Sequence, residues 1–209
     1  MELSEAVRRR RMVRRFDPAA AVDAALVDDL LALAARSPSA GFTQGWDVLV
    51  LGAAPDRERF WAAAVGEGAP DAWLRGVSAA PVLVLWLSDP QAYLDRYAEP
   101  DKGWADRSPD RWPVPYWDTD AAMAAMVVLL GAVDRGLGAL FFGVPGPRHD
   151  AVRAAFDVPD GRRLVGVVAL GHEARRVSGS AGTRPRRPLA EVVHHGRFGV
   201  SQRAPGPGL

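Results

Sequence analysis

The chain has 209 residues, of which 48% are hydrophobic and 24% are charged, values typical of one large globular domain. It contains no cysteine, which excludes disulfides, thiolate metal sites and a cysteine nucleophile. The net charge of +1 argues against a general polyanion binder, so we expect no nucleic-acid partner. No secretory signal pattern is visible, and apolar runs such as 121–133 are too short to span a bilayer. We therefore expect a cytoplasmic protein without a membrane partner.

The first half of the chain predicts helices alternating with buried strands. Residues 2–14 form a predicted helix with arginines at its C-terminal end, where cations suit the helix dipole. Residues 21–36 carry apolar side chains at near-helical spacing, and Ser37-Pro38 ends this second helix. A strand at 47–51, a helix at 56–65 and a continuously apolar strand at 81–87 follow.

The second half continues the alternation. The predicted elements are a long Ala- and Met-rich helix at 118–136, a short strand at 140–142, a helix at 149–156 and a buried strand at 164–170. This order predicts an α/β or α+β class with a covered central sheet. Residues 88–117 form a predicted long irregular segment, which is usually functional or mobile. The Gly- and Pro-rich residues 199–209 form a tail that we expect to be disordered.

Six arginines lie within residues 8–15. They are either a solvated helix face or weak nucleic-acid patch, or a phosphate site, because the guanidinium fork matches phosphate oxygens. A second cluster at Arg184, Arg186 and Arg187 favours the phosphate interpretation.

Two glycine-containing segments also have structural and functional interpretations. Residues 37–46 are either a helix stop followed by a loop or a set of small polar contacts to a ligand. The glycines of 136–143 have the wrong spacing for a dinucleotide fingerprint and follow a helix instead of a strand. Gly136 instead predicts a left-handed helix cap. The histidines show no metal-ligand spacing, and neither a nucleophile elbow nor a Walker loop is present, so we expect no metal and name no catalytic side chain.

These segments, taken in order, resemble the nitroreductase-like flavoproteins. The resemblance rests on Arg10–Phe16, Ser37–Trp46, Gly136–Gly143 and Arg184–Leu189. It implies an α+β fold with a central, mostly antiparallel sheet flanked by helices, in a single domain at 1–198. It also implies an intertwined homodimer, joined partly through 118–136, that binds FMN between its subunits. The implied activity passes hydride from NAD(P)H through flavin N5 to a small, aromatic or conjugated acceptor.

The resemblance assigns FMN contacts residue by residue. The phosphate contacts would come from the arginine clusters, ring contacts from the loop after the second helix, and main-chain contacts to N5 or O4 from the segment after Gly138. These cofactor-binding residues are Arg10, Arg11, Met12, Arg14, Pro38, Ser39, Ala40, Gly41, Phe42, Gln44, Phe142, Gly143, Arg184 and Arg186.

The aromatic residues of the irregular segment are candidate substrate contacts on a lid over the flavin. Simple packing explains them about as well, since Trp and Tyr are often partly buried. They are Tyr97, Trp104, Trp112, Tyr116 and Trp117.

Three positions depart from the family pattern. Met12 stands where many relatives have serine, Phe42 where asparagine is usual, and Gly45 where proline is usual. Phe42 favours a flavin-consuming enzyme of the same superfamily, whereas Met12 argues against it because those enzymes carry an acid there. A non-catalytic flavin- or ligand-binding relative is the other alternative.

Overall fold

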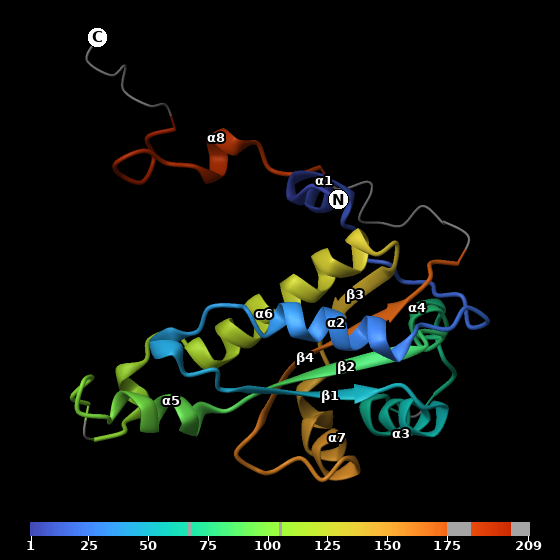
Figure 1. Ribbon diagram of the computed structural model, residues 1–209, viewed down its shortest axis with the longest axis horizontal. Helices are drawn as coiled ribbons and strands as arrows, with labels where there is room; N and C mark the ends of the chain where they lie inside the picture. Colours follow the sequence, from blue (N-terminus) through green and yellow to red (C-terminus); the bar gives the residue numbers. More distant parts are fainter. Residues whose placement is uncertain (67, 105, 175–184, 202–209) are drawn as a thin grey trace. The chain divides into compact units, whose positions relative to one another are not determined.

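The computed structural model describes residues 1–66, 68–104, 106–174 and 185–201. The chain divides into two units, Met1–Arg175 and Arg176–Leu209, each of which is described by itself. The first unit contains a four-stranded sheet with helices on both of its faces (Figure 1).

The sheet has the strand order β1-β2-β4-β3, formed by β1 (Trp46–Leu51), β2 (Val82–Ser88), β4 (Arg163–Gly171) and β3 (Gly138–Phe142). Every neighbouring pair is antiparallel, which confirms the predicted α+β class. Strand β2 is central and buried along its whole length, as its continuous apolar sequence predicts.

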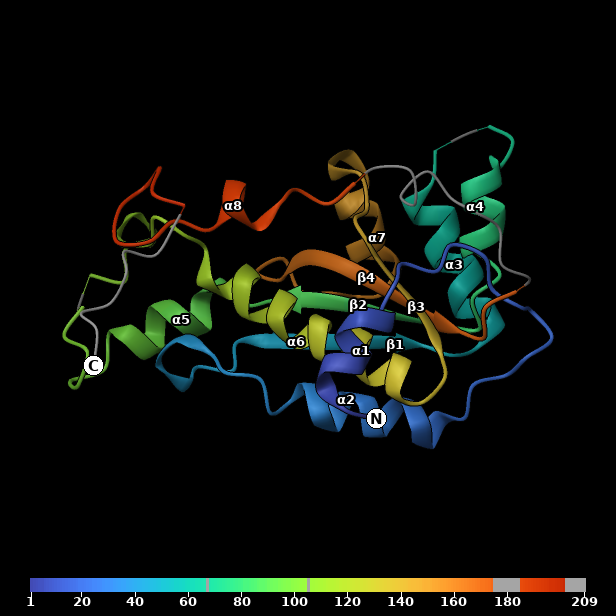
Figure 2. The ribbon, with the colours of Figure 1, turned by 90° about the horizontal axis from the view of Figure 1, so that it is seen from above.

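The two faces of the sheet bury two separate cores, because successive strand side chains point to opposite faces. Leu83, Leu85 and Leu87 of β2 pack in one core with α3 (Ala54–Ala64), α4 (Ala72–Val77) and α7 (His149–Ala155). Val82, Val84 and Trp86 pack in the other core with α2 (Ala24–Ala34) and α6 (Tyr116–Asp134). Figure 1 shows α2 and α6 together above β1 and β2, and in Figure 2, seen from above, α6 crosses in front of the strands.

Helix α6 is longer than the apolar run seen in the sequence, and its length and composition would suffice to cross a membrane. Half of its apolar window is buried inside the protein, which is how a core helix behaves. A Cβ at Gly131 would lie 2.6 Å from Leu30 Cδ2, so this glycine permits the close approach of α2. The helix ends at a glycine with positive φ, as predicted: Gly136 has φ 72°, and the Leu137 N–H donates to the Ala132 carbonyl at 2.8 Å.

The structure corrects two predicted elements. The first helix, α1, spans Leu3–Arg9 and does not reach Arg14. The chain leaves it to pair with the sheet, since Met12 bridges Ala139 and the Val13 N–H donates to the Ala139 carbonyl at 2.9 Å. The segment predicted to be irregular contains a helix, α5 (Pro90–Tyr97), which begins at a proline and is capped by Asp89.

In the second unit, the described residues 185–201 include α8 (Leu189–Val192) and an ion pair between Arg187 and Glu191 at 3.2 Å. Arg186 is exposed. Arg184 and residues 202–209 of the predicted tail lie outside the described residues. The boundary placed at residue 199 stays a prediction.

Candidate functional site

A cavity of about 680 Å³ opens beside the end of β3, a volume within the usual range for small-molecule pockets. Helix α3, the loop that follows it, helix α4 and the segment after β3 form its walls. Its lining residues are Trp61, Ala64, Val65, Gly66, Gly68, Ala69, Asp71, Trp73, Leu74, Phe142, Gly143, Val144, Pro145, Pro147 and Arg148.

Flat aromatic side chains form one wall of the cavity. The rings of Trp61 and Phe142 stack with centroids 5.6 Å apart and planes 9° apart, and Trp73 meets Phe142 edge-on at 5.6 Å. The Trp61 Nε1 donor is buried and has no hydrogen-bond partner within the described part of the chain. Such a wall suits a planar conjugated ligand that carries at least one acceptor.

The rim of the cavity contains exposed main-chain atoms and charged side chains. A Cβ built on Gly143 would meet no described atom within 4 Å, so this main chain borders open space. Arg148 contributes a guanidinium, and Asp71 caps α4 by accepting from the Leu74 N–H at 2.7 Å. Phe142 and Gly143 were predicted as main-chain contacts to flavin N5 or O4, and both line the cavity. Trp61 and Trp73 were missed, because nothing local in the sequence relates them to β3.

The N-terminal arginine segment lies along the strand that ends at this cavity. Met12 bridges Ala139 in parallel, and its Sδ accepts from the Phe141 N–H at 3.5 Å. The thioether therefore receives a backbone donor at the position where many relatives carry a serine. Phe142 follows immediately, so the arginines on either side of Met12 lie on the edge of the sheet that leads to the cavity.

The three N-terminal arginines predicted to bind the phosphate differ in their environments. Arg11 donates through Nε to Glu173 at 3.3 Å, and a second nitrogen pairs with the same carboxylate. Arg14 donates to the Met12 carbonyl at 3.2 Å. Arg10 Nη1 is buried without a partner among the described residues, a condition that native proteins seldom leave unexplained. Of these three residues, Arg10 alone has a buried side-chain nitrogen without a partner in the described part of the chain.

The loop predicted to contact the flavin ring lies at the other end of the sheet. Its short 3₁₀ helix, Ala40–Phe42, precedes β1, whereas the cavity helix α3 follows β1. Gly41, Phe42 and Gln44 have φ values of 62°, 54° and 53°, and Phe42 is 75% exposed. A single chain consequently does not bring the predicted contacts at 38–44 to the segment that follows β3 (Figures 1 and 2).

The five candidate substrate residues gather in one aromatic cluster, together with Tyr93. Trp112 occupies its middle, with ring centroids 4.6 Å from Tyr97 and 5.8 Å from Trp117. Trp104 and Tyr116 lie 5.5 and 5.7 Å from the same ring. Mutual packing accounts for these positions, and the substrate role stays a prediction.

The comparisons with known proteins agree with this fold. The model of the nitroreductase family matches residues 7–172. An uncharacterised 15.4 kDa protein of Mycolicibacterium smegmatis is 39% identical over 103 residues, which cover 46% of this chain and 67% of that protein.

Solved structures of low identity share the architecture. A protein of Exiguobacterium sibiricum 255-15, named as a nitroreductase and solved in complex with FMN, gives a TM-score of 0.75 at 17% identity, covering 93% of this chain and 97% of its own. A nitroreductase family protein of Streptococcus pneumoniae TIGR4 gives 0.71 at 20% identity, covering 93% and 100%. A protein of Clostridium acetobutylicum named for NADH oxidases gives 0.65 at 21% identity, covering 92% and 99%. With the family model matching most of its length, the chain belongs to the nitroreductase family.

Proposed function

We propose that the protein is a cytoplasmic FMN-dependent oxidoreductase that passes hydride from NAD(P)H to a small aromatic or conjugated acceptor. The observation that carries this proposal is the cavity of about 680 Å³ with stacked aromatic walls beside the open backbone of Gly143. The family membership and the FMN held by the Exiguobacterium protein support the same cofactor.

The residues present fit FMN at both of its ends. The Trp61 and Phe142 rings provide flat apolar surface for the tricyclic ring, and the main chain at Phe142 and Gly143 can approach its polar edge. The buried, unpartnered Arg10 Nη1 supplies a donor for the phosphate. When bound, FMN supplies the hydride chemistry at N5, and the protein contributes orientation, electrostatics and exclusion of water.

The remaining predicted contacts support a site shared between two subunits. The loop at 38–44 and the aromatic cluster lie together at the end of β1 opposite the cavity, so a second copy would have to bring them to it. The helical face carries exposed apolar side chains that association with a second copy would bury. They are Leu33 of α2 and Met123 and Met126 of α6. In a two-fold homodimer each subunit would then complete its partner's cavity.

The chemistry within the cavity does not require a side-chain acid or base. Among the lining residues that the structure describes, Asp71 and Arg148 carry ionisable side chains, and Asp71 caps α4. Protons for the reduced acceptor would come from water admitted with the substrate. Arg186, which the family resemblance assigns to the phosphate, is exposed, and its role stays part of the proposal.

The test is the visible spectrum of the purified protein, followed by identification of the released chromophore. We expect a flavin band with about one FMN per subunit, because the cofactor carries the hydride chemistry, and oxidation of NADH or NADPH when an aromatic acceptor is added. A colourless protein that takes up no added FMN would contradict the proposal. Oxygen-dependent disappearance of FMN during turnover would instead identify the flavin-consuming alternative.

A further inference from the structure

We infer that Asp120 is a positioning residue that holds the loop Ser39–Gln44 in the shape in which it meets a partner subunit's flavin. The inference rests on the proposed function, because the loop matters to catalysis only if it contacts the cofactor. It concerns a residue of α6 that lies away from the cavity itself.

One oxygen of the buried Asp120 carboxylate binds both the loop and α5. The residue is 1% exposed, and its Oδ2 accepts from the Ala40 N–H at 2.8 Å and from the Tyr93 hydroxyl at 2.7 Å. A buried carboxylate is costly unless it is hydrogen-bonded, so this contact fixes Ala40 firmly. Burial, and then the bond to Asp120, raises the pKa of Tyr93 far above its usual range, which keeps the phenol a donor.

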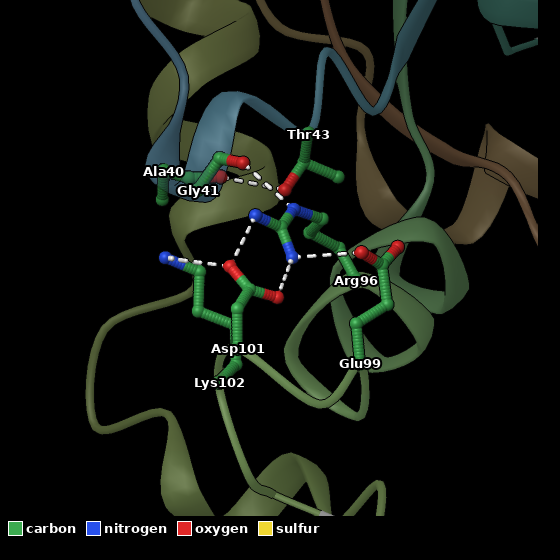
Figure 3. Close-up of polar contacts among 7 residues, drawn as sticks. All are labelled: Ala40, Gly41, Thr43, Arg96, Glu99, Asp101 and Lys102. Carbon is green, nitrogen blue, oxygen red and sulfur yellow. Dashed lines mark hydrogen bonds and ion pairs between the residues drawn. The ribbon is translucent and has the colours of Figure 1, made fainter.

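A second contact fastens the next residue of the loop. Arg96 of α5 donates through Nε to the Gly41 carbonyl at 3.0 Å (Figure 3). Its other nitrogens bind Asp101 at 2.7 and 2.8 Å and Glu99 at 2.9 Å, and these ion pairs orient the guanidinium. The loop is thus held by its Ala40 N–H from α6 and by its Gly41 carbonyl from α5.

Two glycines allow the loop to lie against the tyrosines of α5. A Cβ at Gly41 would lie 2.8 Å from Tyr97 Cε2, and a Cβ at Gly45 would lie 2.5 Å from Tyr93 Cε2. A side chain at position 45, where relatives usually carry proline, would clash with Tyr93. This is the tyrosine whose hydroxyl donates to Asp120, so Gly45 is required here. The loop and the aromatic cluster form one interlocked unit.

These contacts hold the loop in a backbone conformation that is unfavourable for its non-glycine residues. Phe42 and Gln44 have left-handed backbones, and positive φ is rare for a bulky side chain unless its surroundings impose it. The result is an aromatic side chain that is 75% exposed on a fastened loop. Without Asp120, the loop would relax toward ordinary dihedral angles, and its contacts with the partner's flavin would be lost.

The experiment compares three variants of the full chain. Asp120→Ala removes the acceptor, Asp120→Asn keeps one oxygen able to accept both bonds, and Ser88→Ala removes a different buried bond to α6, that of Ser88 Oγ to Asp118 at 2.6 Å. For each variant we would measure the FMN dissociation constant by fluorescence titration and the melting temperature. The rate of chymotryptic cleavage at Phe42 in flavin-free protein gives a readout that does not depend on the cofactor.

We expect Asp120→Ala to bind FMN about tenfold more weakly and to be cleaved faster at Phe42, with Asp120→Asn close to the wild type in both. Ser88→Ala should lower only the melting temperature. Unchanged affinity and cleavage in Asp120→Ala would overturn the inference, as would an equal loss of affinity in Ser88→Ala. If Asp120→Ala does not fold, Ala40→Pro removes only the N–H donor at the start of the 3₁₀ helix and must show the same two effects.

The two proposals can fail separately. A wild-type protein that binds no FMN defeats the proposed function before any variant is compared. A wild type that binds FMN, with Asp120→Ala binding it equally well, defeats only the positioning role.

Discussion

The thioether of Met12 accepts the backbone N–H of Phe141, 129 residues away, at 3.5 Å. This contact fastens the N-terminal arginine segment to β3, the strand that leads directly into the aromatic cavity. The two arginines that precede Met12 differ in their environments: Arg11 pairs with Glu173, whereas Arg10 has a buried donor without a partner among the described residues.

Arg10→Ala should weaken FMN binding about tenfold to a hundredfold, since a hydrogen bond to a charged group contributes roughly 1.5–3 kcal/mol. The fold should be unaffected, because Arg10 Nη1 has no partner among the described residues. Titration with FMN at two salt concentrations measures the effect, and Arg8→Ala, on the exposed face of α1, is the matched control. The double variant Arg10→Ala/Arg184→Ala should lose FMN further. Full flavin occupancy in that double variant would defeat the phosphate assignment.

Gly143→Ala should weaken FMN binding with little change in stability. The added Cβ would meet no described atom within 4 Å, yet it would occupy space at the cavity rim that the ring edge needs. Gly146→Ala is the control, because its Cβ also enters open space but the residue does not line the cavity. FMN titrations of both variants measure the change in affinity, and their melting temperatures measure the change in stability. Equal FMN affinities in the two variants would remove the main chain at Gly143 from the proposed site.

Met123→Glu/Met126→Glu should convert a dimer into monomers and abolish FMN binding at the same time. Both side chains are exposed on one face of α6, at 39% and 38%, and two charges there would have to be desolvated on association. Size-exclusion chromatography with light scattering gives the mass, and absorbance gives the flavin content. Ala151→Glu on the exposed face of α7 should change neither. A monomeric variant that still binds FMN would show that one subunit suffices.

Asp101→Asn should lower the melting temperature slightly at neutral pH and have no effect in strong acid. The bond from Arg96 lowers the pKa of Asp101 below its ordinary 3.8, so the charged form is favoured in the folded protein. That stabilisation is present above the unfolded pKa and is lost as the pH falls through the folded value. Thermal melts from pH 7 to pH 2 would show it. The difference should be small and shrink in high salt, since Asp101 is solvent-exposed and Arg96 is partly so. A difference that persists unchanged to pH 2 would contradict it.

Local sequence determined most of the secondary structure and, through the family resemblance, the fold class. The uninterrupted apolar run at β2 required a strand buried on both faces, and Gly136 required a left-handed cap. The Ala- and Met-rich helix α6 was evident from composition and length. These features depend on propensities and spacings within a few residues, which a single sequence displays directly.

Only the tertiary structure decided where the first helix ends and which arginine of the N-terminal cluster has a buried donor without a partner among the described residues. Helical spacing alone carries the first helix to Arg14, but pairing of Met12 with Ala139 ends it at Arg9. Likewise, the stack of Trp61 on Phe142 and the hold of Asp120 on Ala40 join residues about 80 positions apart. The separation of the loop at 38–44 from the cavity follows from their places at opposite ends of β1. Such contacts arise from how the elements pack, and no local pattern in the chain encodes them.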